Sequence, residues 1–554
     1  TRFNVYRDKT KLTPTPISEL NFTDSGGSAA SSYSVRPVVG IDQHAAAQAG
    51  PTWTTPYLSI PVQQPAGGTT PDGVAYTYDL NDGTPADLDG DGTYEIIVKW
   101  QPTNAKDNSQ SGYTGNTFID AYKLDGTRLW RIDLGRNIRA GAHYTTMVAY
   151  DFDGDGKAEL MLKTADGTVD GTGRVIGDAS ADYRNSAGYV LAGPEFLTVF
   201  NGKTGKAMKT TNYLPARGTV ADWGDSYGNR VDRFLGGVAN LDGNRPSAIF
   251  SRGYYTRAVI AAWDWRDGQL TSRWVFDTDQ AGVEARGQGV HWFSTADVNG
   301  DGGDDIIYGA AAINSDGKLL YSTGLCHGDA LHDGKLDPTQ PGQQTYMVHE
   351  TPKCYGPYGA AMHNSATGAV LWGVSGENAD VGRGLCADID PTYLGEECWA
   401  NRGGLRSAQG VQIGTTKPGP TNFAIWWDGD ALRETLDGTI IGKWDPATSK
   451  VATLVNGADA GAASNNGTKA TPVLAADLFG DWREEVVWRN STNTALLVYS
   501  TTTPTSIVMP TLMHNPQYRA QVANQNAGYN QPPHPSFYLG DGMRPVSQEP
   551  VHTP

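Results

Sequence analysis

The chain has 554 residues, enough to bury a large core, and its formal net charge is −17, with 60 acidic against 43 basic residues. This acidic balance argues against nucleic acid as a partner, because that partner requires a basic face. No apolar run approaches the roughly 20 residues that span a bilayer, so no membrane partner is expected either. The 68 glycines, 15 tryptophans and 26 tyrosines predict short strands and many turns rather than helices.

An acidic motif recurs along the chain, each time after a short run of small and apolar residues. Its three nearly complete copies are DLDGDGTYEI from Asp87, DFDGDGKAEL from Asp151 and DVNGDGGDDI from Asp297. Its three weaker copies are NLDGNRPSAI from Asn240, DIDPTYLGEE from Asp388 and DLFGDWREEV from Asp477. Most copies run into a short segment rich in strand-forming residues, such as IIVKW or LMLKT. The motif therefore predicts an acidic turn followed by a strand, repeated along the chain.

A second repeat, strand–turn–strand, lies between the acidic copies. Its members are FIDAYKLDGTRLWRIDL from Phe118, FLTVFNGKTGKAMKTT from Phe196, VIAAWDWRDGQLTSRWVF from Val259, AAMHNSATGAVLW from Ala360 and FAIWWDGDALRETLDGTIIGKW from Phe423. The Asp-Gly and Thr-Gly pairs between apolar runs indicate hairpin turns. One unit is therefore a small antiparallel sheet, and units repeated around an axis form a β-propeller, here of seven or eight blades. A β-solenoid is the alternative, with shorter and more regular rungs.

The acidic copies place carboxylates at relative positions 1, 3, 5 and 9, with glycines at the sharp turn. Such an oxygen-rich loop suits Ca²⁺, which takes six to eight hard oxygen ligands and offsets the carboxylate repulsion. A solvated acidic turn is the alternative for any single copy, and Ala248 and Phe479 weaken the copies in which they occur. The expected loop ligands are Asp87, Asp89, Asp91, Glu95, Asp151, Asp153, Asp155, Glu159, Asp297, Asn299, Asp301, Asp305, Asp388, Asp390, Asp477, Asp481 and Glu485.

The four cysteines lie close together in the sequence, and none belongs to a C-x-x-C pair, which argues against zinc or thioredoxin-like chemistry. For an exported protein we expect two local disulfides, Cys326–Cys354 and Cys386–Cys398. Four free thiols are the alternative.

Catalytic groups are expected outside the repeats, where loops of different blades converge. Four non-repeated stretches stand out: GQGVHWF, GLCHGDALHDG, GRG and NNGTK. They contain His291, His327, Arg383 and Lys469. Taken alone, each histidine is more often structural than catalytic, and Lys469 could be a solvated loop residue. The glycines beside Arg383 allow a ligand to approach closely.

These strings resemble the rhamnogalacturonan lyases of polysaccharide lyase family 11. The resemblance is carried by KDNSQSGYTG, RNIRAGAHYT, YGNRVDRFLGGVA, ADVNGDGGDDIIYGA, YSTGLCHGDALHDGKLDP and WWDGDALRETLDG, and it runs from about residue 1 to 550. It implies an all-β fold, an eight-bladed β-propeller stabilised by several calcium ions, as one catalytic domain over residues 1–554. It also implies a secreted protein, expected to be a monomer, that cleaves rhamnogalacturonan I, an acidic plant cell-wall polysaccharide, by β-elimination.

The resemblance also implies roles for individual residues. Arg383 matches the arginine that binds the uronate carboxylate, Lys469 a cleft lysine, and His291 and His327 two cleft histidines. The matching sugar contacts are Asn81, Asn466, Gly467, Thr468 and Tyr529. Gln101 stands where some members of the family have an aspartate, an exchange that preserves a hydrogen bond to sugar but not a carboxylate role.

β-Elimination requires a positive environment for the uronate carboxylate, a base for the proton on C5 and help for the departing oxygen. Arg383 and Lys469 supply positive charge. The candidate bases are His291, His327 and Lys469, and a histidine is favoured because it is neutral near pH 7. The histidines could instead hold a cleft metal together with Asp329 and with His349 or Glu350, although calcium prefers the carboxylates.

Two other functions fit parts of the sequence. A calcium-stabilised propeller that only binds acidic polysaccharide would explain the acidic loops but not the joint occurrence of Arg383, Lys469 and the histidines. A glycoside hydrolase with two catalytic carboxylates is the other alternative. The segment TTKPGPTNF, residues 415–423, is short, which favours an open cleft and cleavage within the polymer.

Overall fold

The computed structural model describes residues 1–46 and 53–546, and this part of the chain is mostly β-strand. From residue 57 onward, the described residues form eight large antiparallel sheets, most of them four-stranded, and one two-stranded ribbon. In most of the large sheets each strand pairs with the next strand along the chain, as the predicted hairpins require. This mostly β arrangement of small sheets is consistent with the expected propeller.

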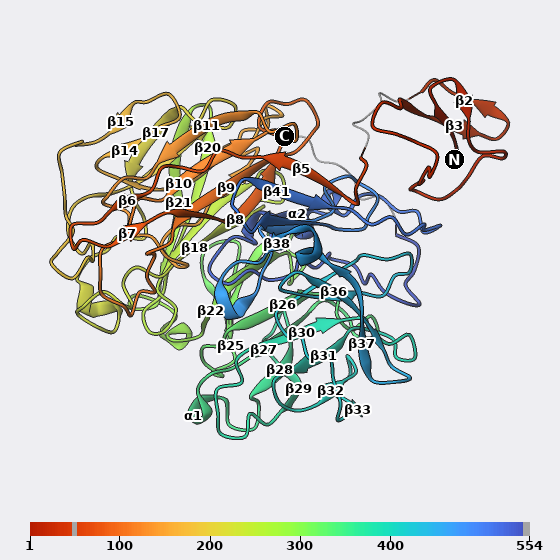
Figure 1. Ribbon diagram of the computed structural model, residues 1–554. Helices are drawn as coiled ribbons and strands as arrows, with labels where there is room; N and C mark the ends of the chain where they lie inside the picture. Colours follow the sequence, from red (N-terminus) through yellow and green to blue (C-terminus); the bar gives the residue numbers. More distant parts are fainter. Residues whose placement is uncertain (47–52, 547–554) are drawn as a thin grey trace.

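The sheets are arranged in a ring, and in Figure 1 the colours pass around it from orange through yellow and green to blue. One strand of each sheet lies innermost, and in every sheet but the last it is the first along the chain. These strands are β8 (Tyr78–Ala86), β12 (Val148–Tyr150), β18 (Phe234–Ala239), β22 (Gly289–Ala296), β26 (Ala330–Gly334), β30 (Gly384–Ala387), β34 (Phe423–Ile425) and β39 (Leu474–Ala476). Each contacts the next from β8 to β34, and β39 contacts β8. Phe423 of β34 and Ala475 of β39 share a core cluster, which completes the circle.

The last sheet is completed by a strand from the other end of this region. Strand β5 (Tyr57–Pro61) pairs antiparallel with β41 (Ala495–Tyr499), with Tyr57 opposite Tyr499. The ring is therefore closed by backbone hydrogen bonds between segments far apart in the sequence. Such closure leaves few free strand edges.

A short helix, α2 (Pro516–Asn524), contacts the innermost strands β8, β12, β18, β22 and β39. Asn515 caps its start, since the Asn515 side chain accepts a hydrogen bond from the amide of Tyr518, and Pro516 occupies the first turn. Most of its residues are buried, so the helix has no polar face and no amphipathic pattern. Sequence analysis did not identify α2 for this reason.

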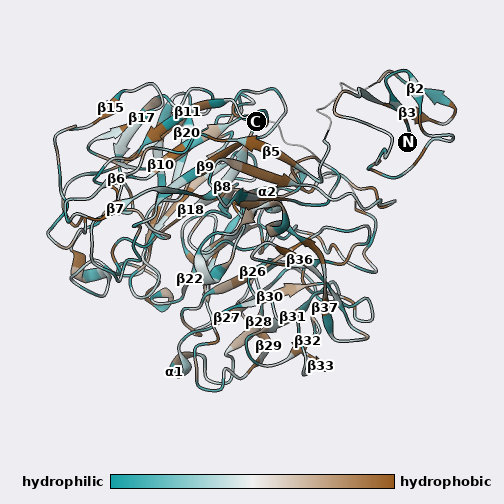
Figure 2. Cartoon of the chain, in the orientation of Figure 1, coloured by the Kyte–Doolittle hydropathy of each residue, from teal (hydrophilic) through white to brown (hydrophobic). Residues whose placement is uncertain are grey.

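Hydrophobic clusters fill the space between neighbouring sheets, and Figure 2 shows brown segments concentrated on the strands of the ring. Tryptophans link sheet to sheet through their indole N–H groups. Trp130 donates to Gly202 O (2.6 Å), Trp274 to Ser315 O (3.0 Å) and Trp488 to Gly438 O (3.0 Å), each in a neighbouring sheet. The ring therefore combines apolar burial with satisfied indole donors.

The first residues form a sheet of their own, of order β2-β1-β3-β4, which Figure 1 shows beside the ring. Its strands are β1 (Arg2–Arg7), β2 (Thr10–Lys11), β3 (Tyr33–Val39) and β4 (Asp42–Gln43). Val5 and Val38 are its buried hydrophobic residues. The amide of Leu20 donates to Thr505 O (3.3 Å), which ties this region to the ring. The stretch expected to be one unit, residues 1–554, therefore includes a sheet outside the ring.

The repeats correspond to the structure with one correction. The predicted strands after the acidic turns are present, including β9 (Glu95–Pro102) and β13 (Glu159–Ala165). The stretch from Phe423, interpreted as a hairpin repeat, instead begins with an innermost strand and an acidic turn. Its hairpin comes later, between β35 (Glu434–Asp437) and β36 (Ile440–Asp445). Among the described residues no helix is long and apolar enough to cross a membrane.

Candidate active site

Side chains from successive sheets meet where the innermost strands begin. They precede or open these strands: Asn81 and Asp82 in β8, His143 before β12, Arg233 before β18, His291 in β22, Asp329 before β26, Arg383 before β30, Asn422 before β34 and Lys469 before β39. Because the innermost strands surround one axis, their starting ends bring distant parts of the sequence together. The four non-repeated stretches that sequence analysis selected all contribute to this set.

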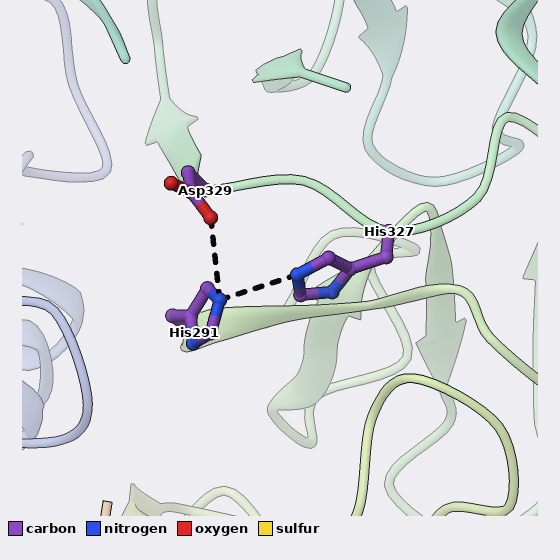
Figure 3. A group of neighbouring side chains, drawn as sticks. All are labelled: His291, His327 and Asp329. Atoms are coloured by element: carbon purple, nitrogen blue, oxygen red, sulfur yellow. Dashed lines mark hydrogen bonds and ion pairs between the residues drawn. The ribbon is translucent and has the colours of Figure 1, made fainter. Parts of the chain in front are cut away.

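His291, His327 and Asp329 form the centre of the site (Figure 3). His291 Nε2 lies 3.2 Å from Asp329 Oδ1 and 3.2 Å from His327 Nε2. His327 Nδ1 lies 2.6 Å from Gly289 O, a carbonyl that only accepts, so Nδ1 carries the proton and Nε2 presents a lone pair. Glu350 Oε2 is 3.4 Å from the same Nε2 atom. Ring nitrogens and carboxylate oxygens thus converge, which fits a bound cation.

Burial keeps these histidines neutral. It lowers the pKa of His291 to about 4, against the opposing effect of the hydrogen bond to Asp329. Burial also holds the pKa of His327 well below its usual range. For Asp329, burial favours the neutral acid, but the hydrogen bond from His291 and the charges of Lys469 and Arg383 hold the carboxyl pKa well below its usual range. Glu350 has a raised pKa because of burial and the neighbouring Asp329 charge.

Two cationic side chains flank Asp329. Lys469 Nζ lies 3.1 Å from Asp329 Oδ2 and 4.2 Å from the centre of the Tyr529 ring. Arg383 is buried and donates from Nη1 to Asp329 O (3.0 Å) and from Nη2 to Asn422 O (3.2 Å). Its Nε has no partner among the described residues, so the guanidinium is fixed in place with donors to spare. The Tyr529 ring stacks on His291 at 4.1 Å between centroids.

The predicted sugar contacts form a neighbouring amide cluster. The side chain of Asn81 donates to Asn466 (3.1 Å), and Asn466 donates to Asp82 (2.8 Å). Gly467 and Thr468 belong to the 3-10 turn η4 (Gly467–Lys469), which begins at Asn466 with a positive φ of 60°. The Asn81 Oδ1 atom is buried and unpartnered in the described structure.

Gln101 lies apart from this cluster, in strand β9, where it pairs with Asp79 of β8. Its Oε1 atom is buried and without a hydrogen-bond partner among the described residues.

Sequence analysis assigned no role to several residues beside the histidines. The Tyr254 hydroxyl lies 2.9 Å from His291 Nδ1 and 3.2 Å from His143 Nδ1, and so links the two rings. The Tyr255 hydroxyl lies 3.3 Å from His291 Nε2. Arg230 lies over the Tyr255 ring at 3.6 Å. Two of these residues lie in strings that carried the family resemblance: His143 in RNIRAGAHYT and Arg230 in YGNRVDRFLGGVA. These strings were the sequence signal that could have identified them.

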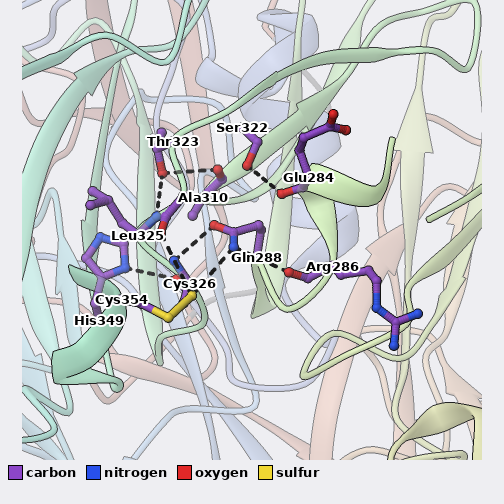
Figure 4. The surroundings of a disulfide bond; sticks show 11 residues. Glu284, Arg286, Gln288, Ala310, Ser322, Thr323, Leu325, Cys326, His349 and Cys354 are labelled. Atoms are coloured by element: carbon purple, nitrogen blue, oxygen red, sulfur yellow. Dashed lines mark hydrogen bonds between the residues drawn. A yellow bond between two sulfur atoms is a disulfide. The ribbon is translucent and has the colours of Figure 1, made fainter. Parts of the chain in front are cut away.

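Both expected disulfides are confirmed, and each lies next to the site. Cys326–Cys354 anchors the segment just before His327 to helix α1 (Pro352–Tyr355), as Figure 4 shows. Gln288 accepts a hydrogen bond from the amide of Cys326 (2.9 Å), and His349 Nδ1 lies 3.0 Å from Cys326 O. His349, considered above as a cleft ligand, thus supports this loop. Cys386–Cys398 joins β30 to the next strand, just after Arg383.

The acidic motifs lie at the other ends of the innermost strands. The structure brings Asp87, Asp89 and Glu95 together, and likewise Asp151, Asp153 and Glu159. A third such group, formed by Asp428, Asp430 and Glu434, was missed because Trp426 and Ala431 stand where the motif has its first aspartate and its second glycine. Burial and the three neighbouring aspartates raise the pKa of Glu159 to about 8, so its charge requires compensation.

Other motif carboxylates are satisfied by the protein itself. Asp477 accepts from the hydroxyl of Thr511 (2.6 Å) and the amide of Leu512 (2.8 Å). Asp388 accepts from the hydroxyl of Tyr538 (2.6 Å). These partners reduce the need for a metal ion in the two weaker loops.

Comparisons with known proteins identify the family of this chain. Residues 57–549 match the family model "Rhamnogalacturonan lyase family 11, C-terminal domain", and residues 1–53 match "Rhamnogalacturonan I lyases beta-sheet domain". The chain is 58% identical over 553 residues to the rhamnogalacturonan endolyase YesW of Bacillus subtilis, covering 100% of this chain and 88% of that protein. It is 54% identical over 562 residues to the rhamnogalacturonan exolyase YesX of the same species, covering 98% of this chain and 91% of that protein.

A solved structure of a Bacillus licheniformis rhamnogalacturonan lyase superposes with a TM-score of 0.95 at 57% identity, covering 99% of this chain and 93% of that one. The matched residues include both the ring and the small first sheet. The chain belongs to rhamnogalacturonan lyase family 11.

Proposed function

We propose that this protein cleaves the rhamnose–galacturonate backbone of rhamnogalacturonan I by β-elimination and leaves an unsaturated galacturonate end. The observation that carries the proposal is the pair of cations, Arg383 and Lys469, held on either side of Asp329 beside two neutral histidines. Such a site attracts a uronate carboxylate and stabilises the charge that moves onto it. Without these two cations, membership of the family would support binding of the polysaccharide but not its cleavage.

In this mechanism Arg383 binds the galacturonate carboxylate through its spare N–H donors. A base removes the proton from C5, and the electrons of the C5–H bond form the C4=C5 double bond. The C4–O4 bond breaks, its electrons remain on O4, and O4 takes up a proton. Asn81, Asn466 and the backbone of η4 orient the sugar so that the C5 proton faces the base.

We assign the base to Lys469 rather than to a histidine. His291 Nε2 donates to Asp329, and His327 Nε2 faces His291 and Glu350, so neither nitrogen is free to reach C5. Burial also lowers the pKa of His291 to about 4, which makes it a weak base for a carbon acid. The side chain of Lys469 keeps 20% of its surface exposed and crosses the Tyr529 ring toward the cleft.

The residues that would hold a cation in the cleft are His291, His327, Asp329 and Glu350. When bound, a divalent cation supplies positive charge next to the uronate carboxylate. We propose calcium here and in the Asp87, Asp151 and Asp297 loops, because carboxylate oxygens are its preferred ligands. His291 Nε2 contacts Asp329, and His327 Nε2 contacts Glu350, so each histidine positions one of the two carboxylates.

We further propose that the eight sheets are the blades of one propeller, which is the catalytic unit, and that the protein acts as a secreted monomer. The ring closure through β5 and β41 supports eight blades, and the two disulfides support an oxidising compartment. The short segment 415–423 supports cleavage within the polymer.

The test is the rate at which purified protein generates ultraviolet-absorbing unsaturated uronate from rhamnogalacturonan I, with homogalacturonan as the control polymer. We expect absorbance to rise on rhamnogalacturonan I. Chelation of divalent ions should lower the rate of this rise. New reducing ends without the double bond would instead indicate a hydrolase. Binding without new ends would leave a polysaccharide-binding propeller. Early formation of long products would support internal cleavage, whereas short products alone would support attack at chain ends.

The assignment of Lys469 as base has its own test, the pH profile of kcat/KM. A lysine base gives activity that rises toward alkaline pH, because the ammonium must lose its proton before it accepts one. A base with the lowered pKa of His291 would give a rate that is flat above about pH 5. A flat profile would therefore return the role to a histidine.

A further inference from the structure

The acidic loop that opens at Asp428 contains a cation of its own. The Lys443 ammonium lies 2.5 Å from Asp428 Oδ2, 2.8 Å from Asp430 Oδ2 and 3.0 Å from Glu434 Oε1. These are the three carboxylates that form the potential metal group of this loop. Lys443 reaches them from β36, two strands further along the same sheet. Glu434 is fully buried, and this contact places a positive charge directly beside it.

The Asp151 loop has the same position in its sheet and no such lysine. Asp151, Asp153 and Glu159 are grouped as closely as the Asp428 carboxylates. The nearest ammonium is that of Lys157, 3.8 Å from Asp155 and about half exposed, and it makes no ion pair with the three grouped carboxylates. The two loops therefore differ in what supplies the positive charge.

The Asp87 loop is intermediate. Lys123 lies 2.8 Å from Asp89, 3.2 Å from Asp91 and 3.5 Å from Glu95. This loop keeps the complete motif, because Asp87 is also present and accepts from the amides of Gly90 and Gly92. The Asp428 loop, in contrast, has Trp426 where the motif has its first aspartate. It offers fewer oxygens, whereas calcium takes six to eight.

We propose that Lys443 replaces the metal ion in the Asp428 loop, so that this blade is held by an internal ammonium and takes no calcium. An ammonium group has three N–H donors, and here three carboxylates receive them. The Asp428 loop thereby obtains its positive charge from a side chain of the protein, whereas the Asp151 loop obtains it by binding an ion. The contrast rests on the calcium ions proposed above, but the role of Lys443 does not.

The test compares Lys443→Met with the wild type and with Lys157→Met, a matched control in the Asp151 loop. Methionine retains most of the aliphatic stem and removes the charge. With a chelator present, we expect Lys443→Met to unfold several degrees below the wild type, while Lys157→Met unfolds with the wild type. After calcium is added and excess is removed, Lys443→Met should hold one more ion per chain than the wild type.

Equal calcium content and equal unfolding temperatures in Lys443→Met and the wild type would overturn the proposal. If Lys443→Met does not fold, two asparagine variants decide the question instead. Asp153→Asn should lose one calcium ion relative to the wild type, whereas Asp430→Asn should lose none. Loss of an ion in Asp430→Asn would show that the Asp428 loop binds metal after all. A wild type that holds no calcium at all would refute the calcium proposal, and the unfolding of Lys443→Met in chelator would still test the lysine.

Discussion

The two ends of the innermost strands are built on opposite principles. At their starting ends each strand contributes a different side chain, such as His291, Asp329, Arg383 or Lys469, and these meet in one site. At their finishing ends most strands run into versions of one acidic turn. In the proposed function, the repeated end holds blades together and the varied end carries the chemistry. A repeat protein therefore reveals its site where its repeats disagree.

The difference extends to how charge is handled. The starting ends bury charges of both signs against one another, as Lys99 and Asp82 do at 3.2 Å. The finishing ends gather carboxylates that need an added cation, a lysine or protein donors. A cavity of about 610 Å³, lined in part by Tyr94, Tyr150 and Arg519, opens at the finishing ends rather than at the site. The size of a cavity therefore does not locate the chemistry in this fold.

The largest expected effects come from the cations at the starting ends. Lys469→Ala and Arg383→Ala should each lower kcat by about 10²-fold or more, because a base or the carboxylate clamp is lost. The Lys469 side chain is partly exposed, so its removal should leave the unfolding temperature nearly unchanged. Single-turnover rates of unsaturated uronate formation, with far-ultraviolet circular dichroism, check both statements.

The matched control at the finishing ends is Lys157→Ala, which also removes a lysine beside an aspartate. It should keep wild-type turnover. Near-normal activity in Lys469→Ala, or a large loss in Lys157→Ala, would break the division between the two ends.

The second effect separates the carboxylates of the two ends. Asp329→Asn should lower turnover strongly, since it removes the charge that Lys469 and His291 contact, with a smaller change in stability. Asp153→Asn should do the reverse, lowering the calcium content and the unfolding temperature while kcat of the calcium-saturated protein changes little. Turnover and calorimetric unfolding on the same samples provide the check. Equal kinetic losses in both variants would mean that the acidic loops also shape the site.

A third effect is a pH dependence of stability in chelator. Glu159 has an ordinary pKa of 4.5 and a folded-state pKa of about 8, raised by burial and by the neighbouring aspartates. The folded state therefore binds this proton more tightly, and metal-free protein should lose stability as pH rises from about 4.5 to about 8. Calcium should remove that slope, because a bound cation favours the ionised carboxylate. A metal-free protein equally stable across this range would contradict the assignment.

The repeated end was largely predictable from sequence, because its turns use short motifs with fixed spacing. The strands after the motifs, the hairpins and both disulfides were predicted from local patterns. The Asp428 loop was not recognised as a copy because Trp426 replaces the first aspartate of the motif and Ala431 replaces its second glycine. Helix α2 has no amphipathic pattern, since innermost strands surround it. Its signal was the Asn515-Pro516 start, which is too short to stand out.

The varied end was predictable only through the family resemblance, and only for residues with assigned roles. The Tyr254 hydroxyl connects His143 to His291 across more than a hundred residues of sequence, and no local pattern encodes such a contact. Its position follows from the ring, which places the segments before β12, β18 and β22 beside one another.

The smallest effect concerns Arg230, at the edge of the site. Its guanidinium lies over the Tyr255 ring, and no acidic side chain of the described residues pairs with it within 4.0 Å. An unpaired cation near the cleft should attract a polymer that carries a carboxylate on alternate sugars. Arg230→Ala should therefore raise KM by about two- to five-fold with little change in kcat, as expected for one peripheral charge. The effect should shrink at high salt, because screening weakens such attraction.

Arg273→Ala, which removes an arginine paired with Asp242 and Asp264 away from the site, is the control and should leave KM unchanged. An unchanged KM in Arg230→Ala would mean that Arg230 does not attract the substrate. The cations that do so would then be Arg383 and Lys469, and Tyr255 would be the outermost residue of the site.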